Sequence, residues 1–192
     1  MVKQRLSIIS LGILLVLGGC AMSPQSISVN PKVELAESVK NTADGSVSVT
    51  VFDERLSPVV GYRGGVYEAT AITTSDNLAV ALRSVTEQSL QEMGMTATAS
   101  HNIPQFQIYL DTLEYKVPDG SYVTQVDVKA KIRAVLFNGS ERFEGSYSVD
   151  ITERVAKAPS DKKNQELVDK VLGDVLGRLF ADQKFQNFIR KL

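Results

Sequence analysis

The single cysteine of this 192-residue chain, Cys20, follows an apolar run near the N-terminus. Lys3 and Arg5 precede that run, which extends over residues 6–17 without a charge, and two glycines separate it from the cysteine. A basic start, a short apolar core and small residues at its end are typical of a bacterial secretion signal. A membrane-spanning helix needs about 20 apolar residues, so this shorter run predicts a cleaved signal peptide over residues 1–19.

The residues before Cys20 also indicate what its thiol could do. Leu17-Gly18-Gly19-Cys20 resembles the lipobox of bacterial lipoproteins, in which an apolar residue and two small residues precede the cysteine. The resemblance implies that the thiol receives a diacylglycerol, that the chain is cut before Cys20 and that the new amine is acylated. Several acyl chains give stable anchoring to a membrane. The alternative is a buried, inert cysteine that follows a signal core.

The residue after the cysteine bears on localisation. Ala21 stands where an Asp would retain a lipoprotein in the inner membrane of enteric bacteria. By resemblance to that rule, we expect a lipid anchor in the outer membrane, with the chain facing the periplasm. The chain has no second cysteine with which an intramolecular disulfide could form in that compartment.

A second group of candidate residues follows a predicted strand. Asp53 and Arg55 end that strand, and Gly61, Tyr62 and Arg63 come shortly afterwards in a glycine-containing stretch. Binding residues often lie on loops held by a rigid scaffold, and Arg recognises carboxylates and phosphates with two parallel hydrogen bonds. These residues could therefore contact a partner. The alternative is that Asp53 caps the loop and pairs with Arg55 or Arg63, and that Tyr62, like Tyr67, folds back onto the sheet.

Catalytic chemistry finds little support in the sequence. His101 is the only histidine and lies in a turn-like stretch, where we expect a surface side chain. With the lone thiol lipidated, a histidine-based metal site or a Cys–His pair is excluded. Asp111 and Glu114 could in principle hydrolyse glycans, but on a regular strand they face opposite ways. We expect no enzyme activity, no metal, and no cofactor other than the lipid on Cys20.

Composition sets the size and the class of the protein. Removal of residues 1–19 leaves 192 − 19 = 173 residues with 19 basic and 22 acidic side chains, because Lys3 and Arg5 leave with the signal. A net charge near −3 without a basic patch argues against nucleic-acid binding. Pro24 and Pro31 would interrupt a helix, so we predict a lipidated tether over residues 20–44, with one extended piece at 27–35. A single domain would follow over residues 45–192.

Hydrophobic periodicity predicts the elements of that domain. Alternating valines predict a strand over 46–55, and a long loop over 56–74 follows, with one short strand at 66–72. A helix capped by Ser75 should end at Gly94, and a strand over 104–117 should contain a bulge near Asp111-Thr112. A last helix, capped by Ser160, would pack its Gly173 and Gly177 closely on the sheet, and a short amphipathic tail follows.

Residues 122–155 predict a long β-hairpin. Asn138-Gly139 is a favoured pair for a two-residue turn, and placing it in the loop sets Ala134 opposite Phe143, with apolar residues on one face. The same register sets Arg133 opposite Glu144, and one unfavourable pair, Asp127 opposite Asp150. All elements together predict an α+β fold, a two-layer sandwich in which two helices cover one face of a mostly antiparallel, mixed sheet.

Several motifs together resemble the YajG family of bacterial lipoproteins. They are the lipobox, the strand end VTVFDER, the loop LSPVVGYR, the helix ALRSVTEQSLQEMG and the C-terminal amphipathic helix. The resemblance covers nearly the whole chain and implies location and shape more than an activity.

Three functions remain open at this point. We expect a non-enzymatic lipoprotein of the cell envelope that binds a protein partner or assists an outer-membrane or transport assembly. The alternatives are a module that binds a small molecule, lipid or glycan between sheet and helices, and an envelope hydrolase.

Overall fold

The structure is a computed structural model and describes residues 23–64, 69–75, 77–118, 124–156 and 159–192. The signal peptide, Cys20, Ala21 and Tyr67 lie outside these residues. Its elements along the chain are β1 (Gln25–Ile27), β2 (Ser46–Asp53), β3 (Val59–Tyr62), β4 (Ala71–Thr74), α2 (Leu78–Glu92), β5 (Thr96–Ala97), β6 (Gln105–Lys116), β7 (Thr124–Asn138), β8 (Glu141–Val155), α3 (Asp161–Ala181) and α4 (Gln183–Ile189).

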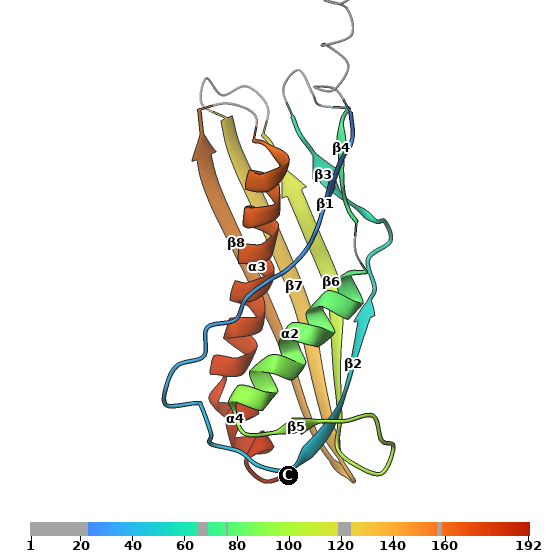
Figure 1. The fold of residues 1–192 in the computed structure, drawn as a ribbon, viewed down its shortest axis with the longest axis vertical. Coiled ribbons are helices and arrows are strands. Elements are labelled where there is room, and N and C mark those ends of the chain that lie inside the picture. Colours follow the sequence, from blue (N-terminus) through green and yellow to red (C-terminus); the bar gives the residue numbers. More distant parts are fainter. Residues whose placement is uncertain (1–22, 65–68, 76, 119–123, 157–158) are drawn as a thin grey trace, which may run out of the picture.

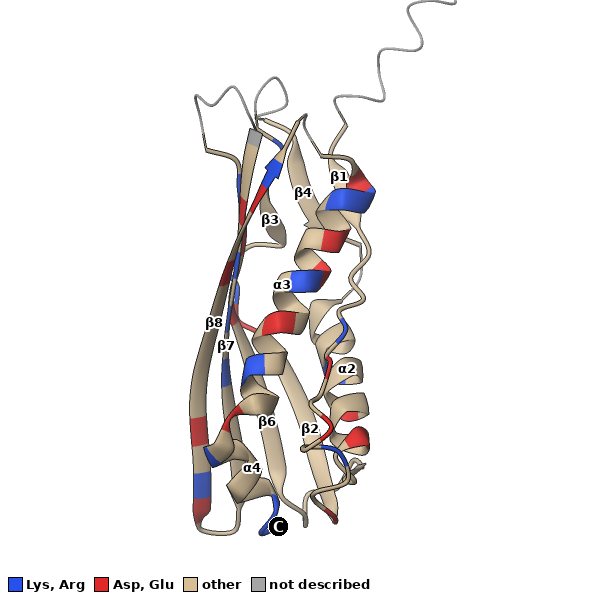
Figure 2. Cartoon of the chain, turned by 90° about the vertical axis from the view of Figure 1, so that its left-hand side faces the viewer, with Lys and Arg blue, Asp and Glu red and all other residues tan. Residues whose placement is uncertain are grey.

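The predicted α+β sandwich is confirmed. The strands form one mixed sheet, in which β6–β7, β7–β8 and β3–β4 are antiparallel and the other pairs are parallel. Helices α2 and α3 lie on the same face of this sheet (Figure 1). Figure 2 shows the charged residues on the outer sides of helices and strands, because the space between the two layers is filled by the apolar core.

Strand β6 organises the sheet. One of its edges pairs with β7 throughout, and the other edge pairs first with β2, up to Asp53 opposite Leu110, and then with β3 at Gly61 opposite Tyr115. The predicted bulge is confirmed by a register shift between Leu110 and Thr112 on the β7 side. The loop between β2 and β3 therefore lies where β3 replaces β2 as the neighbour of β6.

The predicted loop over 56–74 is corrected, because β3 and β4 pair within it. Val59 and Val60 are β-branched residues that favour a strand. Gly61 makes the pairing of β3 with β6 possible, since a Cβ at this position would lie 1.9 Å from the carbonyl oxygen of Tyr115. The sequence prediction treated this glycine as part of a loop, whereas its absent side chain lets the backbones of β3 and β6 approach closely.

The long hairpin is confirmed, but its predicted register is wrong by two residues. Asn138 lies opposite Glu141, so Gly139-Ser140 forms the turn, and Gly139 adopts a φ of +59° as a glycine-first turn requires. A shift of two residues keeps every side chain on its predicted face.

The observed register also removes the charge repulsion that the predicted one contained. Lys129 lies opposite Asp150, with 3.6 Å between Nζ and Oδ1. The hydroxyl of Thr152 donates to Asp127 over 2.7 Å. Arg133 lies opposite Ser146 instead of Glu144.

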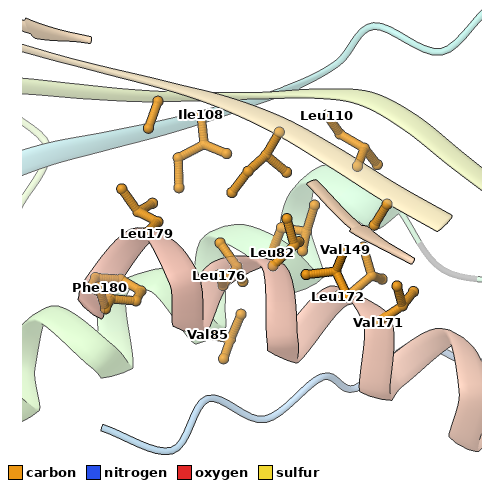
Figure 3. Close-up of a cluster of buried hydrophobic side chains, with 14 of the residues drawn as sticks. Leu82, Val85, Ile108, Leu110, Val149, Val171, Leu172, Leu176, Leu179 and Phe180 are labelled. Atoms are coloured by element: carbon orange, nitrogen blue, oxygen red, sulfur yellow. The ribbon is translucent and has the colours of Figure 1, made fainter. Parts of the chain in front are cut away.

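The helices cover the sheet with their apolar faces. Figure 3 shows Leu82 and Val85 of α2 and Leu172 and Leu176 of α3 pointing into one cluster with Ile108 of β6. Burying each such side chain stabilises the fold by about 1.5–3 kcal/mol. This cluster fixes both helices on the sheet.

The ends of α2 and α3 follow local rules. Asn77, and not the predicted Ser75, caps α2 by accepting the N–H groups of Ala79 and Val80. Gly94 has a φ of +102° and ends that helix as predicted. Ser160 caps α3 as predicted.

The C-terminal tail forms the helix α4, and Asp182 caps it. The carboxylate of Asp182 accepts the N–H of Lys184 and the hydroxyl of Tyr147, each over 2.7 Å. Burial raises the pKa of Asp182. These two hydrogen bonds, a third from the N–H of Phe185, and the charge of Lys184 together outweigh that effect, so the pKa lies below its ordinary value.

The predicted tether is corrected in its described part, because the chain joins the domain from Gln25 onward. Residues 25–27 pair with β4, and Ile27, Val29 and Val39 are buried in the core. The N–H of Asn30 donates to the carboxylate of Asp169 on α3 over 2.7 Å. The apolar residues of this segment are thus core residues.

The two glycines of α3 differ in their surroundings. A Cβ on Gly173 would lie 2.2 Å from the carbonyl oxygen of Lys32, so this glycine packs against the N-terminal segment and not against the sheet. A Cβ on Gly177 would meet nothing within 4 Å. The predicted packing of both glycines on the sheet is therefore wrong. Within the described ranges, no helix has the length and apolar character needed to cross a membrane.

Candidate functional site

Asp53 and Arg55 form an ion pair where β2 ends. Arg55 donates from Nε to Oδ1 of Asp53 over 2.8 Å and from Nη2 to Oδ2 over 2.7 Å. The backbone N–H of Arg55 also donates to Oδ1, over 3.3 Å. Two parallel bonds between a guanidinium and a carboxylate are the strongest geometry for such a pair. Of the two alternatives left by the sequence, the pairing of Asp53 with Arg55 is therefore present.

The pair occupies a partly dehydrated place. Burial raises the pKa of Asp53, but the hydrogen bonds and the charge of Arg55 outweigh it, and the pKa lies below its ordinary value. The side chain of Arg55 is only 8% exposed. Its Nη1 is buried without a hydrogen-bond acceptor. A buried donor without an acceptor costs about 1–3 kcal/mol, and more for a charged group, so an acceptor that reached this atom after a movement of the side chain would stabilise it.

A pocket of about 430 Å³ adjoins this arginine and is here called the Arg55 pocket. It is lined by Asp53, Arg55, Leu56, Ser57, Pro58, Thr74, Asn77 and Leu78. Asn77 and Leu78 begin α2. The N-terminus of a helix carries a partial positive charge, and the first turn of α2 contains no acidic residue. Both features add to the preference of the pocket for an anionic group.

Exposed apolar side chains lie on the segments that build the Arg55 pocket, and one of them, Leu56, lines it. Leu56 is fully exposed and Val80, on the first turn of α2, is 63% exposed. Phe52 is 41% exposed and precedes Arg55 by three residues. Three of the four large apolar side chains that are exposed among the described residues thus lie in the segments that build the pocket. An exposed leucine at the rim of a pocket is a suitable contact for a binding partner.

Phe52 belongs to the face of the sheet that the helices leave open. The ring of Phe52 stacks on Tyr109 with 5.0 Å between centroids, and the guanidinium of Arg133 lies 4.7 Å from the centroid of Tyr109. Arg133 also pairs with Glu54 and, over 3.0 Å, with Asp111. These contacts hold the aromatic rings in place beside the loop.

The carboxylates considered for hydrolysis are both ion-paired. Asp111 contacts Arg133, and Oε2 of Glu114 contacts Nζ of Lys116 over 2.6 Å. His101 is exposed, as predicted. Among the described residues, no three His, Cys, Asp or Glu side chains gather in an arrangement that could hold a metal ion.

Gly61, Tyr62 and Arg63 do not join the Arg55 pocket. Asp53 lies opposite Leu110 of β6, whereas Gly61 lies opposite Tyr115, five residues further along the same strand. This spacing corresponds to about 16 Å. Tyr62 is 53% exposed, and the N–H of Arg63 donates to the carbonyl of Thr70 over 3.1 Å. The structure therefore divides the predicted site into two places.

A buried polar network lies near the second place. The hydroxyl of Tyr115 donates to Oδ1 of Asn164 over 2.6 Å, and Nδ2 of Asn164 donates to Oε1 of Gln25. All three side chains are at most 3% exposed. Burial raises the pKa of Tyr115 far above its ordinary value, although the charge of Arg63 lowers it. The network joins β1, β6 and α3, and the sequence reasoning did not foresee it.

A larger open groove of about 770 Å³ lies along α3, between the N-terminal segment and β8. Several of its polar side chains are already engaged: Nζ of Lys170 pairs with Asp174 over 2.7 Å, and Nη1 of Arg178 donates to the carbonyl of Ser148 over 2.6 Å. None of its described lining residues has a buried polar atom without a partner. The Arg55 pocket is therefore the stronger candidate site.

Comparison with known proteins agrees with the sequence motifs. Residues 31–190 match the profile of a family described as uncharacterized lipoprotein. The uncharacterized lipoprotein YajG of Escherichia coli strain K12 is 25% identical over 183 residues, which cover 93% of each chain, and YajG of strain O6:H1 gives the same values.

Among solved structures, protein XCC0632 from Xanthomonas campestris, described under DUF330, has the same fold. It aligns with a TM-score of 0.59 and 11% identity over 84% of this chain and 95% of that chain. At this identity the likeness concerns the fold alone. The profile match covers most of the chain, and the predicted resemblance to YajG is confirmed. This chain belongs to the YajG family of lipoproteins.

Proposed function

We propose that this lipoprotein is anchored by acyl chains on Cys20 to the outer membrane, faces the periplasm, and binds a protein partner without catalysing a reaction. Family membership supports the anchored envelope protein. The lipobox and Ala21 support the modification and the membrane. The partner would bind at the Arg55 pocket and at the exposed side chain of Leu56, which lines it.

One observation carries the binding role: the guanidinium of Arg55 is nearly buried, and its Nη1 lacks an acceptor beside an open pocket. A small movement of the Arg55 side chain into the pocket would let a carboxylate of the partner supply that acceptor, next to the positive end of α2. An apolar side chain of the partner would cover Leu56, which is fully exposed. Such a combination of an apolar contact with an arginine is common in protein interfaces.

Crosslinking in intact cells tests this proposal. A photoreactive amino acid at Ser57, which also lines the pocket, should form an adduct with one specific protein, whereas the same group at Ser140, in the hairpin turn, should not. Loss of a hydrogen bond to a charged group costs about 1.5–3 kcal/mol. Arg55→Gln should therefore weaken capture by about 10- to 100-fold.

Two further variants serve as controls. Arg83→Gln on α2 removes another arginine, whose side chain is 49% exposed and pairs with Glu87, and it should leave the adduct unchanged. Leu56→Asp should abolish capture without loss of stability, because this side chain has no buried area to lose. An adduct that persists in both Arg55→Gln and Leu56→Asp would refute the proposed site.

The size of the pocket favours a second candidate, a module that binds a small molecule, lipid or glycan. Its volume of about 430 Å³ falls within the common range of ligand pockets. Native mass spectrometry of protein taken from membranes distinguishes the two functions. A small bound mass that disappears in Arg55→Gln would favour this alternative over a protein partner.

A further inference from the structure

We infer that the end of the domain at which β1 begins faces the lipid surface at close range, and that the hairpin turn points away from it. The inference rests on the proposed lipidation of Cys20. Four residues lie between Cys20 and Gln25, the first residue of β1, so the two are five positions apart. A chain spans at most about 3.3–3.6 Å per residue, so the Cα of Cys20 lies within about 18 Å of the Cα of Gln25.

Gln25 is held firmly enough to transmit this constraint to the domain. Its backbone pairs with Ile72 in β4, and its side chain is 3% exposed and accepts a hydrogen bond from Asn164. The next inward-facing residue, Ile27, is 2% exposed in the core. The chain is therefore fixed to the domain at Gln25, and the anchor acts on the folded body through a very short link.

The opposite end of the molecule is far from this link. β1 begins at the end where β8 finishes and α3 starts, whereas the hairpin turn, α4 and the C-terminus lie at the other end (Figure 1). The long strand β7 has 15 residues, which corresponds to a length of about 46–50 Å. With a link of about 18 Å, the hairpin turn could reach the membrane only if the long axis lay along its surface, whereas an upright domain holds the turn away from it.

Tyr62 favours contact of the β1 end with lipid headgroups. It lies opposite Ala71 of β4, and the neighbouring residue Ile72 lies opposite Gln25, so only one strand separates Tyr62 from β1. Its side chain is 53% exposed. Exposed tyrosines are enriched at membrane–water interfaces.

Energy transfer to the membrane surface tests this orientation, because the chain contains no tryptophan. Tyr62→Trp and Ser140→Trp each create a single donor, at the β1 end and in the hairpin turn. The full-length lipidated variants would be placed in phosphatidylethanolamine–phosphatidylglycerol vesicles that contain a dansyl-labelled phosphatidylethanolamine as acceptor. Since transfer falls steeply with distance, we expect it to be several-fold more efficient from position 62 than from position 140.

Equal transfer from both positions, or stronger transfer from position 140, would overturn the orientation. A Cys20→Ser version of each variant gives the baseline without the anchor. Flotation with vesicles separates the two claims: if the Cys20 protein does not float, anchoring itself is wrong and the orientation falls with it. If the protein floats and transfer shows no preference for position 62, only the orientation fails.

Discussion

Replacement of Asn164 by leucine should release the N-terminal segment from the domain. Asn164 is fully buried and is the only described side chain that links the hydroxyl of Tyr115 with the side chain of Gln25. Leucine has a similar size but can neither accept from Tyr115 nor donate to Gln25. Both groups would then be buried without partners, at about 1–3 kcal/mol each, and we expect the free energy of unfolding to fall by about 2–5 kcal/mol.

Thermal and urea unfolding of the lipid-free Cys20→Ser chain measure this effect. For a domain of this size, 1 kcal/mol shifts the melting temperature by about 2–4 °C, so a loss of about 3 kcal/mol corresponds to about 6–12 °C. Tyr115→Phe removes one partner, and the double variant Tyr115→Phe/Asn164→Leu completes a cycle. The double variant should lose clearly less than the sum of the two single losses.

Strict additivity would contradict the network, since residues that share a hydrogen bond couple by about 0.5–3 kcal/mol. An Asn164→Leu variant as stable as the parent chain would also refute it. Proteolysis gives an independent readout, because cleavage after Lys32 should become faster once Gln25 is released.

Two further predictions concern α3 and α4. Gly173→Ala should lower the free energy of unfolding in urea by about 1–3 kcal/mol, because its Cβ would lie 2.2 Å from the carbonyl oxygen of Lys32. Gly177→Ala, whose Cβ would meet nothing within 4 Å, should raise it by about 0.5–1 kcal/mol. Equal effects of both substitutions would contradict the assigned packing. Asp182→Asn keeps a helix cap and an acceptor for Tyr147 but removes the titration of the carboxyl. Because the pKa of Asp182 is lowered in the folded state, its ionised form adds stability above the ordinary pKa, and this stability is lost as the pH falls through the folded pKa. The stability advantage of the parent over Asp182→Asn should thus be constant near neutral pH and shrink below about pH 4, and an advantage that stays constant down to pH 2 would refute this reading.

Local patterns predicted the elements of the fold well where their signals were long. The hairpin of β7 and β8 was foreseen from alternation and from Gly139, but the turn was placed on Asn138-Gly139 instead of Gly139-Ser140. Alternation repeats every two residues and cannot detect a shift by two. The repulsion of Asp127 and Asp150 in the predicted register was the available sign of the error, because the observed register places Lys129 opposite Asp150.

Long-range packing accounts for most of what the sequence did not reveal. Residues 25–44 look like a tether because Pro24, Pro31 and the polar residues interrupt the hydrophobic periodicity that would indicate a helix or a strand. Their apolar side chains nevertheless complete the core. Gln25 and Asn164 are 139 positions apart, so nothing local could pair them.

The candidate site was foreseen in part. The sequence placed Asp53 and Arg55 at a strand end, and the structure joins them. Gly61–Arg63 separate from them because Gly61 is used for contact with Tyr115. Leu56 and the start of α2 were missed, since exposure and a shared pocket arise only from the folded chain.

The mass and N-terminus of the native protein, extracted from membranes of its own cells, test the anchor most directly. We expect a chain that begins at Cys20 and carries fatty acyl groups on its sulfur and its amine. A chain that begins at another residue, or one with a free thiol at position 20, would contradict the anchoring on which the proposed function and the orientation depend.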